Sequence, residues 1–185
     1  MYLRLGFQHI IDVHGYDHIV FVLVLCAAYY LKQLNKVLVL VTAFTVGHSL
    51  TLALSTLNIV TIPSDIVEFL IPATILITAV SNVLPFRSGN HRFIYVITLF
   101  FGLIHGLGFS NYLKELLGRE SNIVKPLLAF NLGLELGQIL ILGIYFLILS
   151  ASTYLLKVKH EFWKIYISGA GFGIALILLI ENKFW

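Results

Sequence analysis

Residues Val124–Ser150 read VKPLLAFNLGLELGQILILGIYFLILS, a long and almost uninterrupted apolar run. A helix needs about 20 apolar residues to cross a bilayer core of about 30 Å, so this run predicts a transmembrane helix. Pro126 suits its first turn, because the N–H that proline lacks would have no helical partner there. Asn131, Glu135 and Gln138 follow one another at i, i+4 and i+7, which places three polar side chains on one helix face.

Five further apolar runs are long enough to be considered as spans. They are Tyr16–Leu31, Val37–Leu57, Pro63–Leu84, Phe93–Leu113 and Phe162–Ile180. The first is short for a span unless residues before His14 are helical as well. Only 11% of the chain is charged, against about 25% in soluble domains. The sequence therefore predicts an all-α, polytopic integral membrane bundle of about six transmembrane helices, forming a single domain over residues 1–185.

The distribution of basic residues predicts the orientation. Six spans place both termini on the same side of the membrane. The first, third and fifth predicted loops carry Lys32, Lys36, Arg87, Arg92, Lys157, Lys159 and Lys164. The other side carries Arg4, Lys114, Arg119, Lys125 and Lys183. Because cytoplasmic loops are enriched in Lys and Arg, we expect both termini outside, in the inner membrane of a bacterium. Loop cations that set topology give no reason to expect a nucleic-acid partner.

Polar side chains recur at matching depth in the threaded helices. An ionisable group inside a bilayer costs several kcal/mol and is a functional hypothesis by default. At 1.5 Å per residue, six of these side chains fall in the outer half of the membrane and Gln138 lies deeper. The six are His18, His48, Glu68, His105, Asn131 and Glu135. Two glycine-spaced seams, Gly102–Gly106 and Gly133–Gly137, predict close helix packing. If these seams meet, His105 and Glu135 lie near each other.

The segment from His9 to His18 reads HIIDVHGYDH and is the densest in potential ligands. His14 and His18 are one helical turn apart, with Asp17 beside them. Such a set can chelate a divalent ion, or the carboxylate can fix the tautomer of a ligating histidine. The alternative is a polar helix start at the membrane interface, where Asp17 favours the helix dipole. Whether His9 or His14 takes part stays open.

These patterns predict a divalent transition metal, Ni²⁺ or Zn²⁺. The candidate ligands are His14, Asp17, His18, His48, Glu68, His105 and Glu135, with Ser49, Asn131 and Gln138 as supporting polar groups. Imidazole and carboxylate without thiolate suit Ni²⁺, Zn²⁺, Co²⁺ or Fe²⁺ and argue against Cu(I). Cys26 is the only cysteine, and a buried structural thiol is its expected role. Nucleotide chemistry is not expected, because no glycine-rich phosphate loop is present.

Each candidate also has a structural explanation. His48 could be a satisfied core residue, Glu68 could pair with a loop lysine, and the glycines around His105 could serve packing alone. Glu135 is the hardest to explain this way, because a carboxylate inside a bilayer requires a partner. His91 and His160 fall in charged loops, and we assign them no function.

The sequence resembles the HupE/UreJ family, which is associated with hydrogenase and urease gene clusters and with nickel uptake. The resemblance spans most of the chain and rests on Gly15–His18, Thr45–Leu52, Glu68, Phe101–Gly106 and Asn131–Glu135. The chain is most similar to the short, roughly six-helix branch. In one departure, Ile11 stands where nickel-permease members carry a histidine four residues before Gly15, and no proline follows. His9 or His14 is the candidate replacement.

The resemblance implies a membrane protein that takes up metal through a histidine and carboxylate site in the outer half of the bilayer. An alternative is an intramembrane zinc hydrolase that acts on a lipid or acylated substrate from the outer leaflet. There the metal would activate water, and Asp17, Glu68 or Glu135 would transfer the proton. A third alternative is a storage or sensory protein that binds metal without flux or turnover. Expected partners are membrane lipids, the metal ion and further copies in a homo-oligomer.

Overall fold

The computed structural model describes residues 1–84, 91–117 and 123–185, and every regular element in these ranges is helical. Arg87 and Arg119, two of the loop cations used for the orientation, lie outside the described residues, as does the side chain of His91. The α-helices are α1 (Tyr2–Ile10), α2 (Asp17–Ala27), α3 (Leu34–Thr56), α4 (Ser64–Val83), α5 (His91–Gly108), α6 (Ser110–Leu117), α7 (Val124–Tyr154) and α8 (His160–Glu181). A short 3-10 turn, η1 (Leu31–Gln33), precedes α3.

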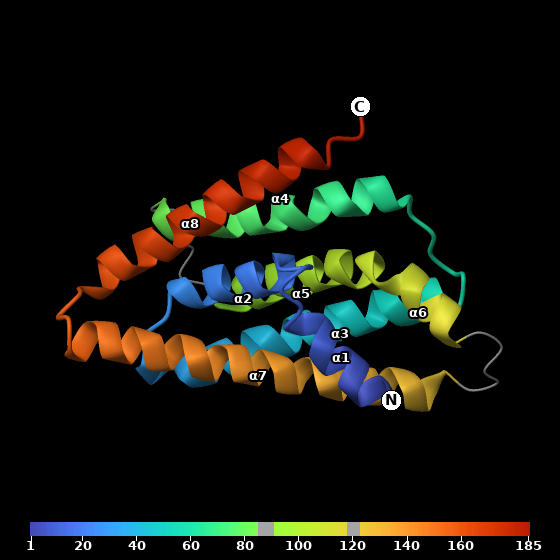
Figure 1. Cartoon of the computed structure of the whole chain (residues 1–185), viewed down its shortest axis with the longest axis horizontal. Coiled ribbons are helices and arrows are strands. Elements are labelled where there is room, and N and C mark those ends of the chain that lie inside the picture. The colour runs from blue at the N-terminus through green and yellow to red at the C-terminus, as the bar shows by residue number, and fades with distance from the viewer. Residues whose placement is uncertain (85–90, 118–122) are drawn as a thin grey trace.

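The long helices lie roughly side by side along the longest axis, and both termini lie toward one end of it (Figure 1). We name this the terminal end and the other the opposite end. Four described helices are long and apolar enough to cross a membrane, and α5 with α6 makes a fifth if the bent pair is one span. The helix α2, with 11 residues, is shorter. A helical membrane protein is confirmed, and the count of six spans remains a prediction.

The first apolar run differs from its predicted bounds. Its helix α2 ends at Ala27 and not at Leu31. The backbone N–H of Tyr30 donates to the side-chain oxygen of Gln33, so this pair begins the next helical segment. Residues before His14 are helical in α1, but residues 11–16 separate α1 from α2, so α1 does not lengthen the first run into one continuous span.

The fourth run is not one continuous helix. Its predicted range Phe93–Leu113 is divided at Phe109 into α5 and α6, which meet at 51°. Gly108 and Ser110 flank the break, and glycine and serine are common at sharp helix kinks. The bend places Phe109 beside His9, with ring centroids 4.1 Å apart.

The two glycine seams do not meet each other. A Cβ at Gly102 or Gly106 would clash with the backbone of α3, and one at Gly133 or Gly137 would clash with α1. The condition from which we expected His105 to lie near Glu135 is therefore not met. A helix surface that permits close approach has several possible partners, and the sequence does not specify which one it takes. The first seam instead brings the histidine-bearing helices α3 and α5 together.

Candidate metal centre

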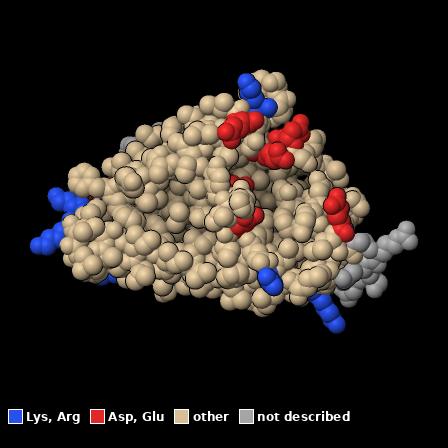
Figure 2. All heavy atoms as spheres, in the orientation of Figure 1, with Lys and Arg blue, Asp and Glu red and all other residues tan. Residues whose placement is uncertain are grey.

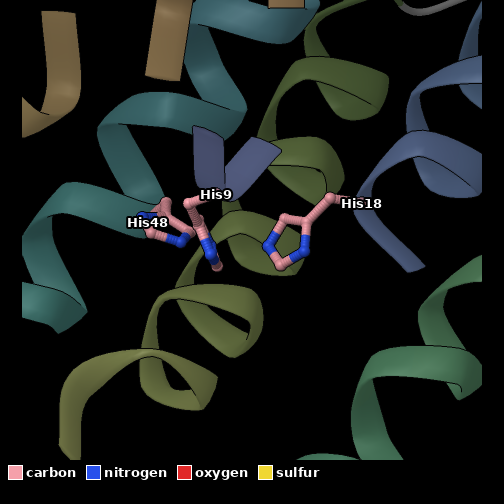
Figure 3. Close-up of side chains that lie close together, drawn as sticks. All are labelled: His9, His18 and His48. Carbon is pink, nitrogen blue, oxygen red and sulfur yellow. The ribbon is translucent and has the colours of Figure 1, made fainter. Parts of the chain in front are cut away.

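Three histidines from three helices converge on one space (Figure 3). His9 lies at the end of α1, His18 at the start of α2 and His48 in the second half of α3. Each offers one ring nitrogen, and these three nitrogens all lie within 4.8 Å of one another. His18 and His48 are buried and His9 is half-buried. We call these three residues the histidine cluster.

The cluster contains ring nitrogens that are buried without a hydrogen-bond partner. They are Nε2 of His9, Nε2 of His18, and both Nδ1 and Nε2 of His48. Leaving a buried polar atom unpaired costs about 1–3 kcal/mol, so such groups nearly always have a partner. Several of them in one place fit a divalent metal ion, which accepts the lone pairs of neutral imidazoles.

Asp17 orients one of the three rings. Its Oδ1 lies 2.7 Å from Nδ1 of His18. A carboxylate can only accept, so Nδ1 carries the proton and Nε2 keeps its lone pair. This carboxylate–histidine pair is the usual way in which a ligating imidazole is held in one tautomer. Of the two roles predicted for Asp17, this contact supports the one that acts through His18.

His105 adjoins the cluster, with its ring centroid 4.9 Å from that of His18. Its Nε2 lies 2.9 Å from Oγ1 of Thr74, whose hydroxyl donates to the carbonyl of Ile71. Because the hydroxyl has one proton, it accepts from Nε2–H of His105, and Nδ1 retains a lone pair. That Nδ1 is also buried without a partner. His105 is therefore a fourth oriented imidazole next to the cluster, although it is not one of the three histidines whose nitrogens lie within 4.8 Å of one another.

Aromatic rings surround these histidines. Phe130 lies 5.8 Å from the His9 ring and 6.3 Å from the His48 ring, and Phe44 lies 5.0 Å from the His105 ring. Such an apolar shell lowers the local dielectric constant and strengthens each metal–ligand contact.

His14 and Glu68 lie apart from the cluster. Both are exposed and line a cavity of about 120 Å³, which we call the outer cavity. Asp17 lines the same cavity while it bonds to His18, so one carboxylate joins the two sites. In Figure 2 the visible Asp and Glu side chains lie in the half of the molecule nearer the terminal end, where a cation is attracted.

Two of the polar groups of α7 lie at its contact with α3. Glu135 accepts a 2.8 Å hydrogen bond from the hydroxyl of Thr42, and Gln138 accepts one of 2.8 Å from Thr45. Among the other predicted supporting groups, Ser49 donates to the carbonyl of Thr45 in its own helix. Oδ1 of Asn131 is buried without a partner.

Sequence reasoning missed two histidines in different ways. It named His14 among the candidate ligands and left open whether His9 or His14 takes part, and the structure places His9 in the cluster and His14 at the outer cavity. It assigned His160 to a loop, whereas this residue begins α8, is buried, and has Nε2 3.1 Å from the carbonyl of Tyr29. The apolar residues that follow His160 were the available signal for a helix start at that point.

Buried imidazoles with free lone pairs inside an apolar helical bundle define an integral membrane protein with a candidate metal site. The family model described as HupE / UreJ protein matches residues 1–182. The chain therefore belongs to the HupE/UreJ family. Comparisons with curated proteins and with solved structures gave no match. Family membership suggests a membrane protein that transports a metal such as nickel or cobalt.

Proposed function

We propose that this protein binds Ni²⁺ or a similar divalent transition metal at the histidine cluster and carries it across the membrane. The observation that supports this most directly is His48, which is fully buried and has no partner for either ring nitrogen. The free nitrogens of His9 and His18 complete a set of three lone pairs. Here the metal is the transported ion and not a resident cofactor.

The outer cavity is the route by which we expect the ion to reach the cluster. Glu68 and Asp17 attract a hydrated cation, and His14 offers a first imidazole. The ion then passes to Nε2 of His18, one residue from Asp17. This assignment gives His14 and Glu68 a role in access, separate from the tight site.

The orientation of the chain decides the direction of transport. We propose that both termini face outside, which makes the terminal end the side of uptake. Labelling of single cysteines introduced between Lys157 and Glu161 in intact cells tests this. Labelling from outside would invert the orientation and make the outer cavity a site on the cytoplasmic side.

Metal binding and flux on the same preparation test the proposal. Protein purified without chelators and loaded with Ni²⁺ should hold about one ion per chain by elemental analysis. In liposomes it should admit Ni²⁺ to a trapped fluorescent chelator. Binding should weaken in acid, because imidazole must be neutral to ligate. The absence of stoichiometric metal at neutral pH after loading would refute the proposal.

A zinc-dependent hydrolase is the second candidate. Ligation by the three histidines found among the described residues would leave one position of a tetrahedral zinc site for water, as in catalytic zinc sites. Of the three carboxylates considered for catalysis, Asp17 is the one that a described contact joins to the cluster, and that contact holds His18. Metal-dependent turnover of a lipid or acylated substrate without metal flux would favour this candidate.

A further inference from the structure

A second cavity of about 180 Å³ lies among α2, α4, α5 and α8. The described residues with polar groups in its lining are Tyr29, Thr78, Ser81, Asn82, Thr98 and Lys164, and the rest are apolar. This volume accommodates several water molecules. We call it the hydroxyl cavity, because four of these six side chains carry a hydroxyl.

The hydroxyl cavity lies beside the histidine cluster, in the direction of the opposite end. Three helices run from one site to the other. Each helix carries one residue at or beside the cluster and, one to two turns away, one residue that lines the cavity. These pairs are His18 and Leu25 on α2, Thr74 and Thr78 on α4, and His105 and Phe101 on α5. The outer cavity, the histidine cluster and the hydroxyl cavity therefore follow one another along the bundle.

A row of hydroxyls on α4 links the two sites. Thr74 contacts Nε2 of His105, and the hydroxyl of Thr78 donates to the carbonyl of Thr74 at 2.7 Å. Ser81 donates in the same way to the carbonyl of Thr78 at 2.8 Å. Because these protons are used within α4, the hydroxyl oxygens retain lone pairs that can accept from water or contact a cation.

Two aromatic rings stand between the cluster and the cavity. Phe101 lines the cavity and lies 6.1 Å from the ring of Phe21 in an edge-on arrangement. The Phe21 ring in turn lies 5.0 Å from that of His105. The two rings therefore connect the surroundings of His105 with the wall of the cavity.

We propose that the hydroxyl cavity is the second compartment on the path of the divalent cation, which enters it hydrated after passing Phe21 and Phe101. This inference rests on the proposed transport function. The described lining residues offer neutral oxygens and no carboxylate, and the ammonium of Lys164 is 2.7 Å from the carboxylate of Glu161. Neutral oxygens hold a transition metal less strongly than imidazoles do, and weak binding is what release requires.

Flux through liposomes tests the role of the hydroxyls. The double variant Thr78→Val/Ser81→Ala removes two oxygens with little change in volume. The matched control is Thr56→Val/Thr153→Val, whose hydroxyls also donate to carbonyls of their own helices but lie outside the cavity. We expect Ni²⁺ flux to fall about tenfold in the first double variant, with Ni²⁺ affinity changed less than about twofold. Flux equal to the control, or loss of Ni²⁺ binding together with flux, would overturn the inference.

Thiol accessibility separates this inference from the proposed function, because it requires no flux. In a Cys26→Ala background, Ser81→Cys should react with a charged, water-soluble methanethiosulfonate. Leu147→Cys, on the exposed face of α7, should not react, because lipid covers that face. An unreactive Ser81→Cys in a protein that binds and transports Ni²⁺ would refute the second compartment alone. A wild type that neither binds nor transports would refute the function, and the inference with it.

Discussion

Helix α3 carries two kinds of polar group inside the same apolar bundle. Thr42 and Thr45 donate to the side-chain oxygens of Glu135 and Gln138 on α7, each at 2.8 Å, although the amide nitrogen of Gln138 is buried without a partner. His48, within one turn of Thr45, has no partner for either ring nitrogen. The difference shows that polarity inside a membrane does not by itself mark a binding site. Contacts between polar groups of two helices hold the helices together, whereas several unpartnered lone pairs gathered in one place predict a ligand.

The substitution His48→Gln should produce the largest effect, because it removes a central ligand from the cluster. We expect at least a 100-fold loss of Ni²⁺ affinity, measured by calorimetry on the purified protein. His160→Gln is the matched control, since His160 is also buried with one free ring nitrogen but lies at the opposite end. Equal affinity in both variants would place the metal elsewhere.

Asp17→Asn should have the next largest effect. The neutral amide oxygen accepts from Nδ1–H of His18 less strongly than the carboxylate does, so the tautomer with a free Nε2 is less favoured. Loss of such a partner typically costs 10–100-fold in metal affinity, and we expect a value in that range. Asp12→Asn is the control, because Asp12 bonds to the backbone of His14 outside the cluster. An unchanged affinity in Asp17→Asn would remove Asp17 from the metal site.

Several features of this molecule could be predicted from the sequence. The long apolar runs predict α3, α4, α7 and α8 to within a few residues, because a membrane requires helices of this length and composition. The sequence predicted His18 and His48 at similar depth, and their ring centroids lie 5.9 Å apart in the structure. Membership of the HupE/UreJ family followed from the spacing of motifs along the whole chain.

Features that depend on which helices meet could not be predicted in this way. The seam at Gly102–Gly106 packs on α3, and the seam at Gly133–Gly137 packs on α1, although either surface suits any close partner. The choice of His9 over His14 depends on how α1 docks against α7, since that contact carries His9 to the cluster. Glu135 was expected at the metal, and the chain instead places it against Thr42.

Glu135→Gln tests whether a paired group also serves transport. The amide oxygen can still accept from Thr42, so the contact between α3 and α7 should persist. We expect unchanged Ni²⁺ affinity and a several-fold slower flux, because an amide neither exchanges a proton nor offsets the charge of a passing cation. Calorimetry and liposome flux on one preparation measure both quantities. Wild-type flux in this variant would leave Glu135 with a structural role only.

Thr45→Val should have the smallest effect and tests the paired side of the comparison most directly. It removes the donor to Gln138 and keeps the side-chain volume. Hydrogen bonds between membrane helices contribute about 0.6 kcal/mol on average, so we expect a loss of that order in the free energy of unfolding, with Ni²⁺ affinity unchanged. Denaturant-induced unfolding in mixed micelles measures it. Ser49→Ala is the control, because its hydroxyl donates within α3 and links no second helix. If Thr45→Val weakened Ni²⁺ binding more than tenfold, the paired groups and the histidine cluster would form one coupled site and the distinction between them would fail.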